Sequence, residues 1–158
     1  MYVHVKVFPG ELSGQGRNNV TFLVPEAIST LGTWLEQLLA ESTGKEGTGL
    51  LPVALEPAGD PAVYGDDRFF AYVRLKGAED PALANRVAAL RRAGHPVVTI
   101  QIDDRLDLGQ EFFRWEIATA TAGAILGINA FNQPNVQESK DNTNRLLGVV
   151  RDGGQLPE

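Results

Sequence analysis

The chain has 158 residues, with 20 acidic side chains against 14 basic ones and a net charge of −6. This length suits one domain with a sizeable core. The basic side chains are scattered and form no stripe along the sequence, which argues against nucleic acid as a partner. The absence of cysteine excludes disulfides, thiolate nucleophiles and cysteine metal sites, and it fits a cytoplasmic protein.

The periodicity of apolar residues predicts strands and helices in alternation. Residues 2–8 alternate between apolar and polar side chains, as a half-buried strand does. Prolines at three positions suit the first turn of a helix. Further strands are expected at 20–24, 50–55, 69–75 and 97–102, and helices at 25–43, 81–93, 108–128 and 134–150.

This order favours an α/β fold, with a mainly parallel sheet and helices on both of its faces. We expect one domain over residues 20–150, an extra strand and loop at 1–19, and a tail at 151–158. The low-charge run 117–131 is shorter than a bilayer span and is interpreted as a buried helix.

Several kinds of site find no support in the sequence. No glycine-rich nucleotide motif follows a strand, and the two histidines, His4 and His95, have no metal-ligand spacing. Three aspartates after the strand at 97–102 are placed either to bind Mg²⁺ or to cap the next helix. They are Asp103, Asp104 and Asp107. Capping is the favoured interpretation, because aspartate is a preferred N-cap residue.

Two polar segments remain as candidates for chemistry. Glu41 ends an apolar helix and is followed by a glycine-rich loop that contains Lys45. In the segment INAFNQPNVQESK, Lys140 lies two helical turns after Gln133 and hence on the same side of the predicted helix. In one interpretation, Glu41 is a carboxylate held at a cleft, and the start of the predicted helix after Gln133 binds a phosphate or sugar oxygen. Ordinary helix ends with a solvent-exposed lysine give the other, which spacing alone favours.

These segments resemble two motifs of the second half of the glucose-6-phosphate isomerase family. The first, Q-x-x-x-E-S-x-G-K, stands here as QLLAESTGK, with Gln37, Glu41, Ser42, Gly44 and Lys45. The second follows an aromatic–Glu pair, Trp115–Glu116, and reads I-N-x-F-x-Q-x-x-V-x-x-x-K from Ile128 to Lys140. The intervening segments are most similar to the isomerase part of bifunctional transaldolase/glucose-6-phosphate isomerases.

The resemblance implies a sugar isomerase (SIS) domain, a three-layer αβα sandwich, that interconverts glucose 6-phosphate and fructose 6-phosphate in glycolysis and gluconeogenesis. It implies that Glu41 moves a proton between C1 and C2 through a cis-enediol, and that Lys140 assists ring opening and proton movement at the sugar oxygens. By the same resemblance, the substrate-binding residues are Gln37, Gln133, Ser42 and Lys45. No metal or organic cofactor is implied.

The chain also departs from the family pattern. The phosphate-binding Ser/Thr loop, the Gly-Gly-Arg segment and the family's histidine have no counterpart, and Asp66, Asp67 and Arg68 stand where the histidine is expected. Residues 1–19 match nothing in the family. We therefore expect a C-terminal half that has little turnover alone and needs the N-terminal SIS half or a transaldolase domain as partner. The alternative is a non-catalytic sugar-phosphate-binding or assembly module of the same fold.

Small residues in the run 117–131 further suggest close helix packing. They are Thr119, Thr121, Gly123 and Gly127. On this basis we expect a homodimer.

Overall fold

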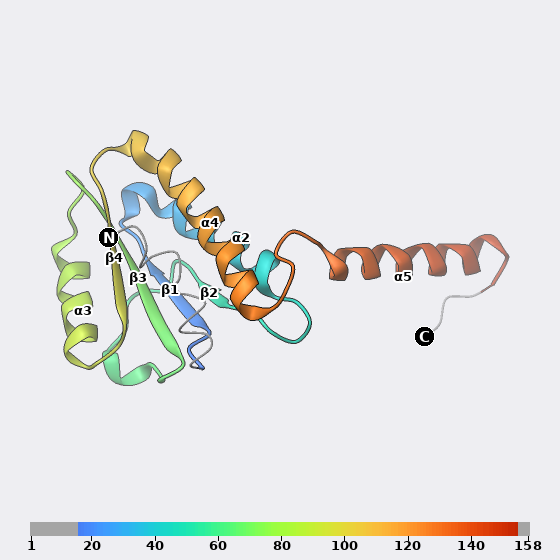
Figure 1. Cartoon of the computed structure of the whole chain (residues 1–158), viewed down its shortest axis with the longest axis horizontal. Coiled ribbons are helices and arrows are strands. Elements are labelled where there is room, and N and C mark those ends of the chain that lie inside the picture. The colour runs from blue at the N-terminus through green and yellow to red at the C-terminus, as the bar shows by residue number, and fades with distance from the viewer. Residues whose placement is uncertain (1–15, 155–158) are drawn as a thin grey trace.

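The computed structural model describes residues 16–154 and shows a parallel sheet between helices (Figure 1). Its four strands lie in the order β2-β1-β3-β4, and every neighbouring pair is parallel. The strands are β1 (Asn19–Leu23), β2 (Leu51–Val53), β3 (Arg68–Leu75) and β4 (Val97–Ile102). The predicted α/β fold is thereby confirmed; the strand expected at 2–8 lies outside the described residues.

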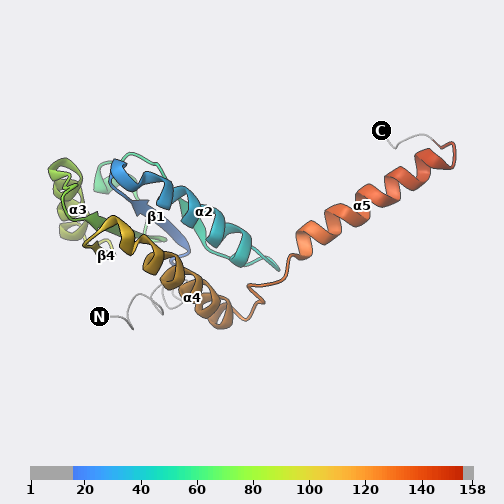
Figure 2. The same cartoon turned by 90° about the horizontal axis from the view of Figure 1, so that it is seen from above.

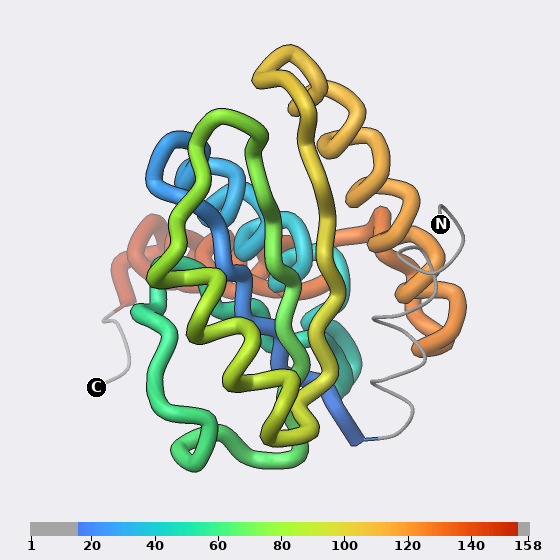
Figure 3. The backbone as a smooth tube through the Cα atoms, turned by 90° about the vertical axis from the view of Figure 1, so that its left-hand side faces the viewer, coloured from blue at the N-terminus to red at the C-terminus, as the bar shows by residue number. Residues whose placement is uncertain are grey.

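The helices cover both faces of the sheet. They are α2 (Ser29–Thr43), α3 (Pro81–Arg92), α4 (Leu108–Leu126) and α5 (Pro134–Arg151). Helices α2 and α4 lie side by side on one face, and α3 covers the other, as Figures 1 and 2 show from two directions and Figure 3 shows from the α3 side. Because both faces are covered, the central strand β3 has a nearly continuous apolar sequence, RFFAYVRL.

Two apolar clusters form the core, one on each face of the sheet. The larger lies under α2 and α4, where Trp115 packs edge-on against Phe22 with ring centroids 5.4 Å apart. The smaller joins Phe70 to Val87 and Leu90 of α3. The helix starts follow the sequence signals, since Asp80 caps α3 by accepting a hydrogen bond from the Leu83 amide at 2.9 Å.

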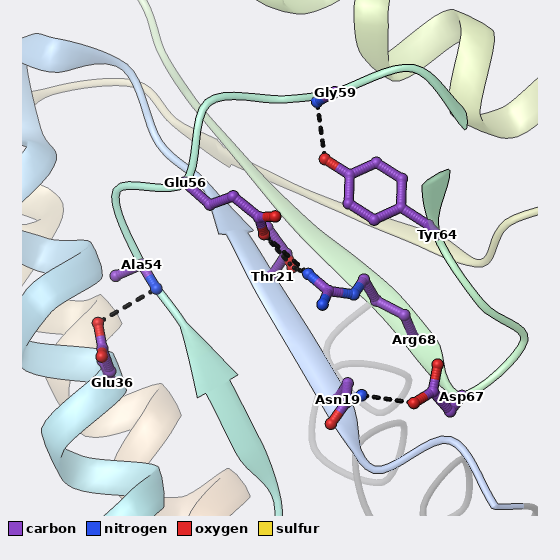
Figure 4. A network of polar contacts seen from close by, with 9 residues as sticks. All are labelled: Asn19, Thr21, Glu36, Ala54, Glu56, Gly59, Tyr64, Asp67 and Arg68. Atoms are coloured by element: carbon purple, nitrogen blue, oxygen red, sulfur yellow. Dashed lines mark hydrogen bonds and ion pairs between the residues drawn. The ribbon is translucent and has the colours of Figure 1, made fainter. Parts of the chain in front are cut away.

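A polar network closes the α3 face of the sheet over β1 (Figure 4). The Arg68 guanidinium donates to Thr21 Oγ1 at 2.6 Å and forms an ion pair with Glu56 at 2.8 Å. It also lies over the ring of Tyr64, 5.1 Å from the centroid, and the Tyr64 hydroxyl accepts from the Gly59 amide at 2.7 Å. The loop between β2 and β3 is therefore held on the sheet by side chains of the loop and of the strands.

Some element boundaries differ from the sequence predictions. The first helix was expected to begin at Pro25, but a 3-10 turn (Glu26–Ile28) precedes α2, which begins at Ser29. The strand expected at 50–55 is limited to Leu51–Val53. The run 117–131 is only partly a buried helix, because α4 ends at Leu126 and the side chain of Phe131 is 84% exposed. No helix among residues 16–154 combines the length and apolarity that crossing a membrane requires.

Helix α5 stands apart from the other elements. It projects away from the end of α4 and the sheet (Figures 1 and 2), and none of its residues is buried. Its start is nevertheless attached to the rest of the fold, because Asn135 Nδ2 donates to the Gly44 carbonyl at 3.4 Å. This attachment brings the beginning of α5 to the end of α2.

Candidate functional site

The first candidate residues lie on the last two turns of α2. Gln37 and Glu41 are both exposed, and Gln37 Nε2 donates to Glu41 Oε1 at 3.1 Å. Four residues is the spacing that places two side chains on one helix face, so the amide orients the carboxylate. A carboxylate at the C-terminal end of a helix also faces the negative end of the helix dipole, which disfavours it by about 0.3–1 kcal/mol. Glu41 therefore stands where helix stability alone would not place it.

The loop after α2 is built by Thr43 and by a tight turn. Thr43 is fully buried, and its hydroxyl donates to the Leu39 carbonyl at 2.7 Å and accepts from the Leu50 amide at 2.9 Å. Backbone bonds between Lys45 and Thr48 then close a two-residue turn. Glu46 and Gly47 inside this turn have φ values of 55° and 77°, as a type I′ turn requires.

Lys45 connects this loop to the second candidate segment. Its side chain is 4% exposed, and Nζ donates to the carbonyl of Asn129 at 2.9 Å and to that of Asn132. These carbonyls belong to the bend between α4 and α5, in which the Asn129 side chain accepts from the Phe131 amide at 2.9 Å. The two segments that carry the sequence motifs, 84 and 87 residues apart at these contacts, thus meet in space.

The second segment presents its polar residues at the start of α5. Gln133 immediately precedes the helix, and its carbonyl accepts from the Gln137 amide at 3.1 Å. Gln133 and Lys140 line one shallow hollow together with Pro134 and Val136. The prediction that Lys140 lies on the same side as Gln133 is confirmed.

The structure does not join the predicted acid to the predicted lysine. Glu41 and Lys140 are both exposed, and in the part of the chain that is described no hydrogen bond or ion pair links them. Lys140 lies within the projecting helix α5, so its position relative to Glu41 depends on how α5 is oriented at its start. Ser42 is half-buried next to Glu41. Convergence of Glu41 and Lys140 on one pocket remains a prediction.

The other sequence candidates have structural roles. Asp104 and Asp107 form a capping box before α4, in which Asp104 Oδ1 accepts from the Leu106 amide at 2.8 Å. This confirms the capping interpretation for Asp104 and Asp107. Over residues 16–154, no three side chains of the metal-binding types gather into a possible metal site. Asp67 accepts from Asn19 Nδ2 at 2.6 Å.

Helix α2 runs antiparallel to the strands, so its end with Glu41 lies near the N-terminal ends of the strands, where Gly44 lines one hollow with Asn18 and Leu51. In open parallel sheets ligands usually bind at the opposite side, beyond the carboxyl ends of the strands. A hollow of about 340 Å³ lies at these carboxyl ends and is lined in part by Arg74, Asp80 and Gln101. Geometry alone therefore offers two places for a ligand.

Comparison with known proteins identifies relatives in sequence. Over an alignment of 157 positions, the chain is 29% identical to the glucose-6-phosphate isomerase of Lactobacillus helveticus, with 77% of the chain and 35% of that enzyme covered. This chain is similar in sequence to glucose-6-phosphate isomerases. It is likewise 29% identical to the glucose-6-phosphate isomerase of Rubrobacter xylanophilus, over 86% of the chain and 40% of that enzyme. A probable glucose-6-phosphate isomerase of Halobacterium salinarum is 27% identical over 84% of the chain and 38% of its own length.

The chain thus spans little more than a third of the length of these glucose-6-phosphate isomerases. No protein-family model matches it. Among solved structures, a hypothetical protein of Thermus thermophilus superposes with a TM-score of 0.70 at 23% identity, covering 87% of this chain and 44% of the other. At that identity the likeness supports the α/β fold.

Sequence reasoning missed the residues that connect the two segments. The carbonyls of Asn129 and Asn132 and the side chain of Asn135 carry the contacts to the loop after α2. A run of three asparagines around a proline in INAFNQPN is the signal in the sequence, because asparagine favours bends and helix starts.

Proposed function

We propose that this chain is the C-terminal part of a sugar-phosphate isomerase that interconverts glucose 6-phosphate and fructose 6-phosphate, with Glu41 as its base. The observation that carries the proposal is the contact of Lys45 with the carbonyls of Asn129 and Asn132. It brings together the two segments whose residues resemble the isomerase motifs. Sequence similarity to glucose-6-phosphate isomerases supports the same conclusion.

Glu41 would act as the proton carrier of the reaction. Its carboxylate takes the proton from C2 of the open-chain aldose, which leaves an enediolate with its negative charge on O1. O1 then gains a proton and O2 loses one, and the carboxylic acid returns its proton to C1 as the C2 carbonyl of the ketose forms. The Gln37 amide, 3.1 Å from Oε1, would hold the carboxylate while its other oxygen faces the sugar. A base of this kind works best when it is partly removed from water. Glu41 is exposed in this chain, so we expect a further part of the larger enzyme to cover it.

Lys140 would act at the sugar oxygens. Its ammonium can give a proton to the ring oxygen as the ring opens, and it can stabilise the negative charge that develops on the enediol oxygens. Gln133, which lines the same hollow, and Ser42, next to Glu41, would hydrogen-bond sugar or phosphate oxygens. In this proposal α5 brings Lys140 toward Glu41 when it packs against the rest of the enzyme.

The deciding experiment replaces Glu41 in the full-length polypeptide. Glu41→Gln should lower turnover of fructose 6-phosphate by about a hundredfold or more, the usual contribution of a general base. Glu46→Gln is the matched control, because Glu46 is an exposed glutamate in the turn that follows α2; it should stay within about twofold of the parent activity. Undiminished isomerisation in the Glu41→Gln enzyme would refute the assignment.

A non-catalytic sugar-phosphate-binding or assembly module is the second candidate, favoured by the open surface around Glu41. Calorimetry separates the two functions. A catalytic site should bind a linear sugar-acid phosphate that mimics the enediol much more tightly than it binds fructose 6-phosphate, because enzymes favour the transition state over the substrate. Equal affinities together with no turnover in the full-length protein would favour the binding module.

The same proposal includes the partners and the setting. We propose that an N-terminal SIS half or a transaldolase domain completes the enzyme, that the enzyme is a cytoplasmic homodimer, and that it needs no cofactor. Light scattering at high protein concentration tests the dimer, and a monomer would contradict that part of the proposal.

A further inference from the structure

Lys45 is an unusual lysine, because its charged end lies inside the protein and faces backbone carbonyls. The side chain is 4% exposed, whereas lysine is rarely buried without a partner. Its acceptors are the carbonyl oxygens of Asn129, at 2.9 Å, and of Asn132. Two of the three N–H donors of the ammonium are thus committed to the chain itself.

The chemistry of the bend explains why a lysine is needed there. Between Leu126 and Pro134 the chain is not helical, so carbonyls in this bend lack the partners that a helix would supply. An ammonium can donate to two converging carbonyls at once, and a charged donor makes hydrogen bonds about twice as strong as neutral ones. Methionine, of similar length, would leave both carbonyls without this donor.

The bend also determines where α5 points. None of the described residues of α5 is buried, so packing along its length does not orient it. Its start is held to the loop after α2 by the Asn135–Gly44 hydrogen bond and by the two Lys45 contacts next to it. Loss of the ammonium would leave the Asn135–Gly44 bond, which is long at 3.4 Å, to hold the junction.

We propose that Lys45 is a positioning residue that binds the α4–α5 bend to the loop after α2 and thereby sets the positions of Gln133 and Lys140 relative to Glu41. The inference rests on the proposed function, in which these residues form the site. It differs from the substrate-binding role that the sequence motif implies for Lys45, because the ammonium is directed at the protein's own carbonyls.

Hydrogen exchange on the 158-residue chain tests the inference without reference to activity. Lys45→Met should speed exchange of the amides at the bend and at the first turn of α5, including that of Gln137, by about tenfold or more, because local opening becomes easier. Exchange in α3 should not change. Lys76→Met is the matched control, since Lys76 is exposed and lies at the C-terminal end of strand β3, away from the bend. Unchanged exchange at the bend in Lys45→Met would overturn the inference.

A chemical rescue tests whether the ammonium itself is responsible for slow hydrogen exchange at the bend. The chain has no cysteine, so Lys45→Cys creates a single thiol in it, and alkylation of the unfolded chain with 2-bromoethylamine places an ammonium at nearly the original length. Slow exchange should return after alkylation and refolding. Should Lys45→Met fail to fold, the same alkylated variant decides: restored protection supports the inference, and an alkylated chain that folds without protection at the bend refutes it.

Kinetics of the full-length enzyme separate this inference from the proposed function. Lys45→Met should lower kcat by about tenfold or more, because Lys140 is then misplaced relative to Glu41, and the rise in KM from the displacement of Gln133 should be smaller than this fall. A raised KM with unchanged kcat would refute positioning and favour substrate binding. If Glu41→Gln leaves activity unchanged while Lys45→Met still frees the bend, the isomerase assignment fails and the structural attachment by Lys45 stands.

Discussion

Thr43 offers the sharpest test of how the candidate site is built. Its hydroxyl joins the last turn of α2 to the residue before β2, through the Leu39 carbonyl and the Leu50 amide. Thr43→Val keeps the shape of the side chain and removes this hydroxyl. The variant should therefore loosen the loop that carries Lys45 while leaving the packing of the core in place.

The cost can be worked out from the two hydrogen bonds. Leu39 loses little, because its carbonyl already accepts the helical N–H of residue 43. Leu50 is 4% exposed, so its amide cannot turn to water when the hydroxyl is gone. A buried donor left without an acceptor costs about 1–3 kcal/mol, which is the expected loss in the free energy of unfolding. Thr43→Ser is the control: it keeps both hydrogen bonds and removes a methyl group worth about 1 kcal/mol.

Urea unfolding measures the difference. Trp115 is buried against Phe22, so its fluorescence should report loss of the core. With a urea dependence of about 2 kcal/mol/M, a loss of about 2 kcal/mol lowers the midpoint by about 1 M. Faster hydrogen exchange at the Leu50 amide should accompany it in Thr43→Val and be absent in Thr43→Ser. If Thr43→Val lies within about 0.5 kcal/mol of the parent protein, the hydroxyl does not hold this loop.

Three further predictions concern stability. Gly49→Ala should destabilise the fold by more than about 2 kcal/mol, because φ is 150° there and an added Cβ would lie 2.9 Å from the Cα of Gly44. Gly47→Ala should cost only about 1 kcal/mol, because φ is 77° at that position and the space around it is open. Equal urea midpoints for the two variants would contradict this prediction. Arg68→Met should cost about 1–2 kcal/mol by removing charged hydrogen bonds, and a midpoint that does not move in urea would show the network of Figure 4 to be dispensable. Burial raises the pKa of Glu111 above its ordinary value of 4.5, so the folded chain binds a proton at this carboxyl more tightly than the unfolded chain does. The resulting stabilisation of the fold is present below pH 4.5 and is lost as pH rises through the raised pKa. Glu111→Gln should flatten this fall above pH 4.5 in urea titrations, and a parallel decline in both proteins would refute the assignment.

The sequence by itself determined the order and type of the elements. The strand at Val97–Ile102 and the helix that begins at Pro81 follow from local signals: an apolar run, an aspartate cap and a proline in the first turn. Such signals act over a few residues and survive without knowledge of the rest of the fold. The polar segments around Glu41 and Gln133 were also found from sequence, because their residue types stand out at the ends of apolar helices.

Tertiary structure decided what these segments touch. The contact of Lys45 with the carbonyls of Asn129 and Asn132 joins parts of the chain that no local period relates. A lysine in a glycine-rich loop has the same sequence pattern whether it faces a ligand, solvent or backbone, and only the path of the chain through the sheet settles the choice. The direction of α5 has the same origin, since an amphipathic helix pattern shows which face is apolar and says nothing of where the helix is attached. Its attachment depends on two hydrogen-bonded loops that meet because the strands between them pack into one sheet.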